Sequence, residues 1–192
     1  MTEVPSWFPG RESKPAPMPL LLVQGFVNTR DLEQGTDLLA DPDTARDWLV
    51  RTRLLDPVAH PTRSELELAR GVRESLRWLL RRDSDGGGEL EDTLAPLRAV
   101  GDSHPARLRV EDSGAIKLEN PGHHALGDGL FELLLIVRRA QEDGTWTRLK
   151  VCANPECQWA FFDRSRNQQG SWCEMATCGN RLKNRELRAR RR

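Results

Sequence analysis

The sequence predicts an α+β fold: a predominantly α-helical N-terminal domain with one β-hairpin, then a small four-cysteine zinc finger module ending in a basic helix. Three patterns predict this class. Apolar residues recur at helical spacing through residues 61–88, apolar and polar residues alternate around a turn within residues 106–120, and all four cysteines follow residue 151. A chain of 192 residues has room for one ordinary domain with a small module attached.

The first segment of the chain is rich in proline. Residues 1–19 hold five prolines and little apolar patterning, so we expect a disordered leader. The apolar residues of the stretch 21–32 then fit a buried helix or a buried strand, and periodicity does not decide between them. We expect an α-rich regulatory or sensor domain over residues 20–147 and the finger module over residues 148–192.

Two helices are predicted early in the N-terminal domain. The first covers residues 41–50, where an aspartate can cap the N-terminus and Pro42 suits the first turn. The second lies within residues 61–88, begins at a Thr62 or Ser64 cap and ends at three glycines. Its apolar positions share one face: Leu66, Ala69, Val72, Leu76 and Leu79.

Three further elements complete this domain. A shorter helix is predicted over residues 89–100, followed by a β-hairpin around the turn Asp112-Ser113-Gly114. A largely buried helix is predicted over residues 127–140, which leads to the cysteines. The longest apolar run is too short to span a membrane, and the N-terminus has no signal-peptide pattern, so we expect a cytoplasmic protein.

Charge is divided unevenly along the chain. Residues 148–192 hold 11 Lys and Arg against 4 Asp and Glu, whereas the other residues hold 18 against 25. A basic end beside an acidic remainder is typical of a segment that binds a polyanion, most often nucleic acid. The alternative interpretation is a solvated charged tail.

The four cysteines form two pairs of equal spacing. Four residues separate Cys152 from Cys157 and Cys173 from Cys178, and 15 residues lie between the pairs. This spacing is typical of one tetrahedral Zn²⁺ held by four thiolates. Such a closed site has no open position for water, so we expect one structural zinc and no enzymatic activity. Disulfides, which the expected cytoplasmic location disfavours, and redox sensing are the alternatives.

The residues around these cysteines resemble a known family. The stretch FFDRSRNQQGSWCEMATCGNR, residues 161–181, is similar to the C-terminal zinc finger named for its CGNR motif. Upstream, GFVNTRDLE (residues 25–33) and ARDWL (residues 45–49) resemble the ABATE domain of stress-induced transcription regulators, which usually precedes that finger. The resemblance covers the chain from about residue 20 and implies a bacterial transcription regulator whose finger binds double-stranded DNA.

The last helix is the predicted DNA-binding surface. Where the family usually has basic residues before its Trp-Cys pair, residues 168–171 are Gln-Gln-Gly-Ser, so DNA contact must depend more on the residues after Cys178. Arginine can pair with guanine, asparagine with adenine, and either arginine or lysine with phosphate. A solvated helix and RNA binding are alternatives. The predicted set is Asn180, Arg181, Lys183, Asn184, Arg185, Arg188, Arg190, Arg191 and Arg192, with Arg164 and Arg166 from the module.

Two polar groups outside the finger are candidate sites. Asn28, Thr29 and Arg30 could recognise a small-molecule effector, or they could satisfy backbone groups at a turn. The pair His123-His124 has no nucleophile or further ligand at a telling spacing, which favours ordinary surface histidines. The sequence therefore predicts a DNA-binding transcription regulator, controlled by a ligand or partner of the N-terminal domain and able to act as a homodimer. The alternatives are a protein-interaction module without DNA binding and a small-molecule-binding N-terminal domain.

Overall fold

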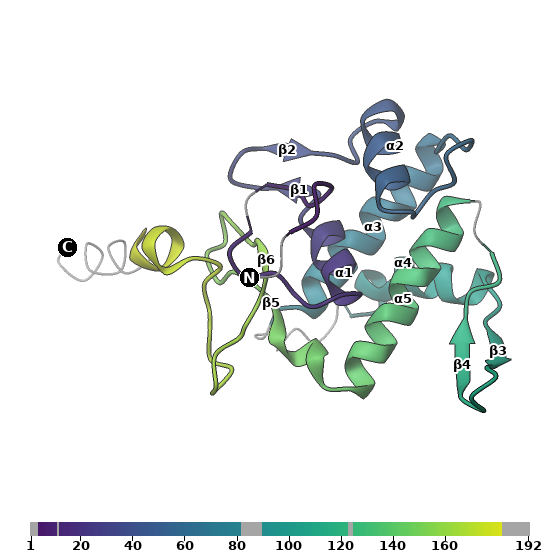
Figure 1. Cartoon of the computed structure of the whole chain (residues 1–192). Coiled ribbons are helices and arrows are strands. Elements are labelled where there is room, and N and C mark those ends of the chain that lie inside the picture. Colours follow the sequence, from purple (N-terminus) through teal and green to yellow (C-terminus); the bar gives the residue numbers. More distant parts are fainter. Residues whose placement is uncertain (1–3, 11, 82–89, 123–124, 182–192) are drawn as a thin grey trace.

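The computed structural model describes residues 4–10, 12–81, 90–122 and 125–181. Its helices form one packed body, and the cysteine-bearing segment lies against one end of that body (Figure 1). The α-helices within the described residues are α1 Leu20–Val27, α2 Pro42–Arg51, α3 Arg63–Leu79, α4 Leu90–Ser103 and α5 Leu126–Glu142.

Three two-stranded antiparallel sheets accompany the helices in the described part of the chain. They pair β1 Arg30–Asp31 with β2 Thr36–Asp37, β3 Arg107–Val110 with β4 Ile116–Glu119, and β5 Leu149–Val151 with β6 Ala160–Phe162. The predicted α+β class is confirmed. The expected final basic helix lies mostly outside the described residues, which include only its first two positions, Asn180 and Arg181.

Helix α1 forms the centre of the body. The apolar stretch that begins near residue 20 is a helix, and every residue of α1 except Leu22 is buried. Apart from Gln24, α1 carries no polar side chain, and a helix that is apolar on nearly all sides belongs in a protein interior. Val23, Phe26 and Val27 are fully inaccessible there, and α1 packs against α3, α5 and β6.

The predicted helix starts are confirmed by their caps. The Asp41 carboxylate accepts hydrogen bonds from the backbone N–H groups of Asp43 and Thr44 at the start of α2. At the start of α3, Thr62 and Glu65 form a reciprocal capping box. These side chains satisfy backbone donors that have no partner inside the helix.

Helices α3 and α4 approach each other closely at a glycine. A Cβ placed on Gly71 would lie 3.0 Å from the Pro96 side chain, so the absence of a side chain allows this contact. Helix α4 also runs past the expected end at residue 100, through Gly101, to Ser103. There the Ser103 hydroxyl donates to the Ala99 carbonyl, which satisfies a terminal acceptor of the helix.

The N-terminal segment differs from the disordered leader that its prolines predicted. In its described residues Phe8 is 7% exposed and Ala16 is 2% exposed. The Trp7 carbonyl accepts from the Trp48 indole, and the Trp7 ring lies against Gly25, where a Cβ would be only 2.7 Å away. Two adjacent aromatic side chains supply the apolar burial that offsets the entropy of ordering this segment.

The finger module shares the core of the N-terminal domain. Leu149, Val151 and Phe162, from β5 and β6, belong to the same buried cluster as the helices. One continuous core therefore crosses the expected boundary at residues 147 and 148. None of the helices within the described residues combines the length and the apolar composition needed to span a bilayer.

Candidate zinc centre and basic helix

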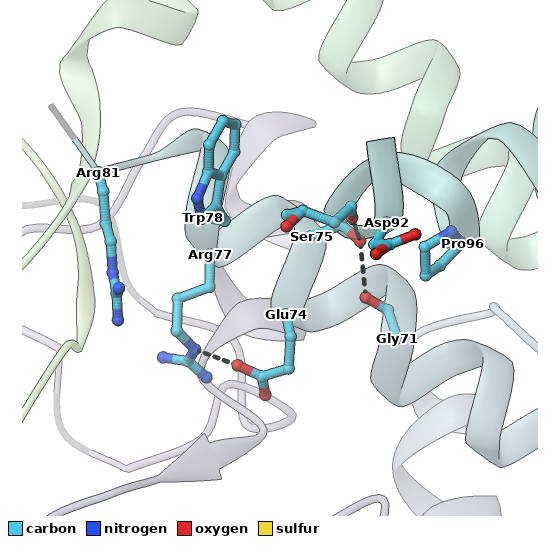
Figure 2. A pocket seen from close by; sticks show the side chains of 9 residues that line it. Gly71, Glu74, Ser75, Arg77, Trp78, Arg81, Asp92 and Pro96 are labelled. Carbon is cyan, nitrogen blue, oxygen red and sulfur yellow. Dashed lines mark hydrogen bonds and ion pairs between the residues drawn. The ribbon is translucent and has the colours of Figure 1, made fainter. Parts of the chain in front are cut away.

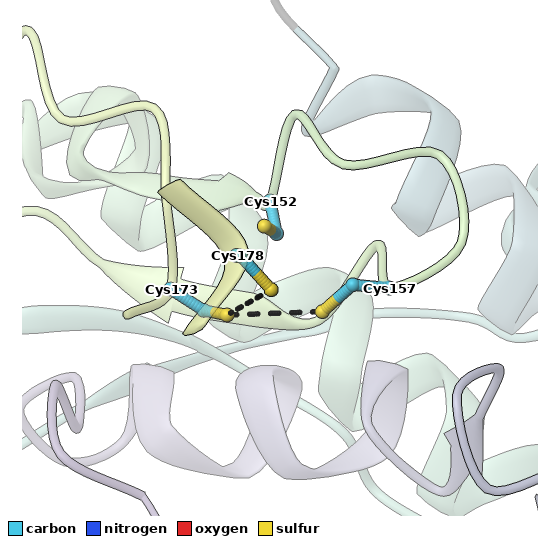
Figure 3. Close-up of side chains that lie close together, drawn as sticks. All are labelled: Cys152, Cys157, Cys173 and Cys178. Atoms are coloured by element: carbon cyan, nitrogen blue, oxygen red, sulfur yellow. Dashed lines mark hydrogen bonds between the residues drawn. The ribbon is translucent and has the colours of Figure 1, made fainter. Parts of the chain in front are cut away.

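The four cysteines converge from separate places in the chain. Cys152 directly follows β5, Cys157 precedes β6, Cys173 lies in the loop after β6, and Cys178 lies in the π-helical turn Met175–Gly179. Their sulfur atoms all lie within 4.8 Å of one another (Figure 3). Two Sγ–Sγ distances, from Cys173 to Cys157 and to Cys178, are 3.7 Å. A tetrahedron with Zn–S bonds of about 2.3 Å has sulfur atoms about 3.8 Å apart, so this set fits one zinc ion.

When thiols lie this close together, ionisation of one disfavours ionisation of the others. Hydrogen bonds from Cys157 and Cys173 lower the pKa of Cys152, because they stabilise its thiolate. The hydrogen bonds that Cys157 and Cys173 donate to Cys152 raise the pKa of both thiols, because each holds its proton in that bond, and the negative charge of Cys152 adds to the effect. A divalent cation at the centre removes this conflict, since it stabilises all four thiolates together.

Asn154 organises the first cysteine pair. This side chain is 2% exposed, and its backbone carbonyl accepts from the N–H groups of Cys157 and Gln158 at 3.0 Å each. Its amide nitrogen lies 3.8 Å from the Cys178 sulfur, so it also contacts the second pair. Hydrogen bonds of this kind orient metal ligands and temper the charge on their sulfur atoms.

Comparison with protein families agrees with this geometry. A family model named ABATE, described as a "putative stress-induced transcription regulator", matches residues 22–142. The chain belongs to the ABATE family. The CGNR zinc finger model matches residues 148–191, so both resemblances seen in the sequence are confirmed. No curated protein matches the chain at a significant level.

The finger is therefore a CGNR zinc finger attached to an ABATE domain, and the family descriptions support a regulatory role. Its four cysteines hold one structural zinc, as the spacing predicted. The two family descriptions are regulatory and zinc-binding rather than enzymatic.

A buried ion pair stabilises the loop between β6 and the second cysteine pair. The Lys150 ammonium lies 2.5 Å from the Asp163 carboxylate, and both side chains are 4% exposed. The carboxylate also accepts from the N–H groups of Ser165 and Gly170, and a Cβ on Gly170 would lie 2.9 Å from it. Burial alone would raise the pKa of Asp163, but the bonds from Lys150, Ser165 and Gly170 hold it well below its usual range.

Two side chains of the ABATE domain form paired hydrogen bonds with the backbone of the CGNR finger. The Asn28 amide bonds to both backbone groups of Ala160 in β6, at 2.9 Å to the carbonyl and 2.7 Å from the N–H. The Arg77 guanidinium donates to the Gln158 carbonyl at 2.8 Å and to the Val27 carbonyl at 2.7 Å. Both side chains are buried, so these contacts hold the segment between Cys157 and β6 against α1 and α3.

The side chains of the polar group Asn28, Thr29 and Arg30 form hydrogen bonds and ion pairs with other residues of the chain. The Thr29 hydroxyl donates to the Phe26 carbonyl and accepts from Arg73, and Thr29 is 2% exposed. Arg30 is exposed and pairs with Glu74 at 3.5 Å. These contacts favour the alternative in which the group satisfies buried polar atoms at the end of α1.

The predicted DNA-binding residues divide into two described groups. Asn180 and Arg181 are exposed and helical at the exit of the zinc cage, and Arg181 forms an ion pair with Glu33 of the β1–β2 loop. Arg164 donates to the Pro15 carbonyl at 2.7 Å, and Arg166 is exposed. The remaining predicted residues lie outside the described part of the chain: Lys183, Asn184, Arg185, Arg188, Arg190, Arg191 and Arg192.

A groove between α3 and α4 was not predicted from the sequence. It encloses about 370 Å³ and is lined by residues that include Glu74, Trp78, Arg81 and Pro96 (Figure 2). Arg77 also lines it and pairs there with Glu74 at 3.1 Å. The groove therefore borders the side chain that holds the zinc-binding segment. Only the tertiary packing of α3 on α4 creates it, so no local motif marks it.

Proposed function

We propose that the CGNR finger binds double-stranded DNA through the basic helix that starts at its last zinc ligand. The observation that carries this proposal is the continuity of ligand and helix. Cys178 lies inside the turn Met175–Gly179, and Asn180 and Arg181 continue directly from it as α-helix. A zinc-bound cysteine at this position would fix the direction in which the basic segment leaves the finger.

Charge supports the same proposal. The excess of Lys and Arg over Asp and Glu after residue 147 lies within the CGNR match, whereas the rest of the chain is acidic. Cationic side chains gain affinity by replacing the counterions of DNA phosphates, so binding should fall steeply with salt. Arg166 is exposed and would add a phosphate contact from the loop, while Arg164 is held by the N-terminal segment.

The contact between Arg181 and Glu33 would compete with DNA. Both side chains are about half exposed, so a phosphate could replace the carboxylate without exposing buried surface. Glu33→Gln should therefore raise DNA affinity slightly, about two-fold, since exposed ion pairs are weak. Asp43→Asn, at another exposed acidic position, is the control, and an equal effect of both changes would contradict a specific role for Glu33.

Fluorescence anisotropy with labelled duplex DNA tests the main proposal. We expect affinity to fall about 100-fold or more between 50 and 200 mM salt if four or more phosphates are contacted. Arg188→Gln with Arg191→Gln should reduce the affinity and the salt dependence. Arg63→Gln with Arg98→Gln, which removes the same charge from α3 and α4, should change neither. Equal affinities of the two double variants would refute the role of the basic helix and favour a protein-interaction finger.

Ligand control through the α3–α4 groove is the second part of the proposal. Arg77 connects this groove to the Gln158 carbonyl beside Cys157, so a molecule bound there would act on the finger through α3. Thr93 also lines the groove, so Thr93→Trp should fill it and change DNA affinity even without a ligand. Ala95→Trp places the same ring at an exposed position of α4 outside the groove. Identical DNA binding by wild type and the Thr93→Trp variant would rule out this coupling.

A further inference from the structure

The β3–β4 hairpin presents an apolar face to solvent. The register pairs Leu108 with Leu118 and Val110 with Ile116, so these four side chains share one face of the hairpin. Leu108, Val110 and Ile116 are 70%, 68% and 69% exposed, and only Leu118 is partly buried against the core. A contiguous group of exposed aliphatic side chains indicates a surface that another molecule covers.

The charged side chains on the opposite face of the hairpin form ion pairs with one another. Arg107 lies 2.5 Å and Arg109 lies 3.6 Å from the Glu119 carboxylate, and Lys117 pairs with Glu111 at 2.6 Å. This face needs no partner. The apolar face therefore has no role in the described part of the chain that would explain why its residues are aliphatic rather than polar.

The apolar face forms one wall of an open groove of about 370 Å³. Leu108, Ile116 and Leu118 line the hairpin side together with Lys117, and the C-terminal end of α5 forms the other side. That end contributes Arg138, which pairs with Glu142 at 2.6 Å within α5, and Arg139, whose charge has no acidic partner among these lining residues. The groove therefore combines an apolar wall with a wall that is basic overall.

The tip of the same hairpin has the complementary charge. Glu111, which pairs with Lys117, precedes the turn, and Asp112 lies in it, where Gly114 adopts a φ of 81°. If two hairpins meet face to face about a two-fold axis perpendicular to their strands, their tips point in opposite directions, and each acidic tip lies toward the basic α5 wall of the other chain. Such self-complementarity is the requirement for an isologous interface between identical chains.

We propose that the β3–β4 hairpin is a homodimer interface, in which the apolar faces of two chains pack together and each acidic tip pairs with the Arg138 end of the other groove. Figure 1 shows the hairpin at the end of the molecule opposite the last turn of the finger. The dimer leaves both fingers uncovered and carries two of them on one particle. Formation of this dimer does not depend on DNA binding.

Sedimentation velocity of the full chain without DNA tests the interface. Wild type should pass from monomer to dimer as concentration rises through the micromolar range. Ile116→Asp should raise the dimer dissociation constant about 100-fold or more, because a buried apolar side chain is lost twice in a two-fold interface. Val58→Asp, at an 86% exposed position outside the hairpin, should leave the dissociation constant unchanged.

A charge exchange tests the arrangement of the two chains. Asp112→Arg should weaken the dimer, and Arg138→Asp added to the same chain should restore it, because each tip then meets the opposite charge again. Circular dichroism should show all variants folded, since the substituted residues are exposed. A wild type that stays monomeric at high micromolar concentration, or an Ile116→Asp variant that dimerises like wild type, would overturn the proposal. Neither outcome would affect the DNA measurements on the basic helix.

Discussion

The β3–β4 and β5–β6 hairpins are built alike and used differently. Each pairs two short antiparallel strands. Every residue of β5 and β6 is buried, whereas every residue of β3 is exposed. Since isolated two-stranded hairpins are only marginally stable, each must gain support from something outside its own strands.

The two hairpins find that support in different ways. Cysteines flank β5–β6, Asn28 bonds to β6, and the helices cover it. The β3–β4 hairpin instead relies on cross-strand ion pairs at the surface, which contribute little in water. The difference teaches that strand pairing does not determine burial. A metal ion and a helix cover one hairpin, and we infer that a second chain covers the other.

Removing one zinc ligand should have the largest effect on the difference between the two hairpins, because only β5–β6 is supported by zinc. Cys178→Ser should abolish tight zinc binding, and structural zinc supplies on the order of 10 kcal/mol of folding free energy in small zinc modules. Amide hydrogen exchange should then speed up in β5 and β6 but not in β3 and β4. Thr177→Ser, the adjacent conservative change, should retain one zinc per chain. Unchanged exchange in β5 and β6 would show that the helices alone stabilise that hairpin.

Breaking the buried ion pair should have the next largest effect. Lys150→Met leaves the Asp163 carboxylate buried without its cation, which should lower the free energy of unfolding by about 3–5 kcal/mol. Chemical denaturation measures this loss. Arg148→Met, which also removes a cation bonded to this loop but one that is less buried, should cost less.

The same pair predicts a dependence on pH. Because the folded pKa of Asp163 is lowered, its contribution is present above the unfolded value of about 3.9 and is lost as pH falls below it. The difference in unfolding free energy between wild type and the Lys150→Met variant should therefore narrow below about pH 4. A constant difference across this range would show that the charge of Asp163 is not its origin.

A leucine removed from the buried hairpin should have a smaller effect. Leu149 is 2% exposed, and Leu149→Ala should lower the free energy of unfolding by about 2–5 kcal/mol, because the removed atoms leave a cavity. Urea denaturation with and without zinc provides the measurement. A loss well below this range would show that the structure collapses around the site.

Local patterns predicted the parts of the fold that local interactions determine. The caps at Asp41 and Thr62, the turn at Gly114 and the cysteine spacing were all visible because neighbours in sequence form them. The zinc site needed only the spacing of Cys152, Cys157, Cys173 and Cys178. These features predicted most elements of the α+β fold and all four ligands of the metal centre.

Interactions between distant residues were not visible in the sequence. Asn28 reaches Ala160, and Arg77 reaches Gln158, because tertiary packing brings α1 and α3 to the finger. The sequence marks Asn28 and Thr29 as a polar pattern but does not identify the distant groups that they contact. Five prolines in the N-terminal segment concealed the docking of Phe8, because composition does not reveal which apolar surface a short segment can cover.

The smallest effect is expected for the matched leucine of the exposed hairpin. Leu108 is 70% exposed, so Leu108→Ala should change the unfolding free energy of the monomer by less than about 0.5 kcal/mol. The measurement must be made at low concentration, where the proposed dimer is dissociated. At high concentration dimerisation should raise the apparent stability of wild type more than that of the variant, so the difference between them should grow, since dimerisation stabilises only the folded state. A concentration-independent difference between wild type and the variant would mean that Leu108 acts within its own chain. The two hairpins would then differ only in how they pack within one chain, and no second chain would cover β3–β4.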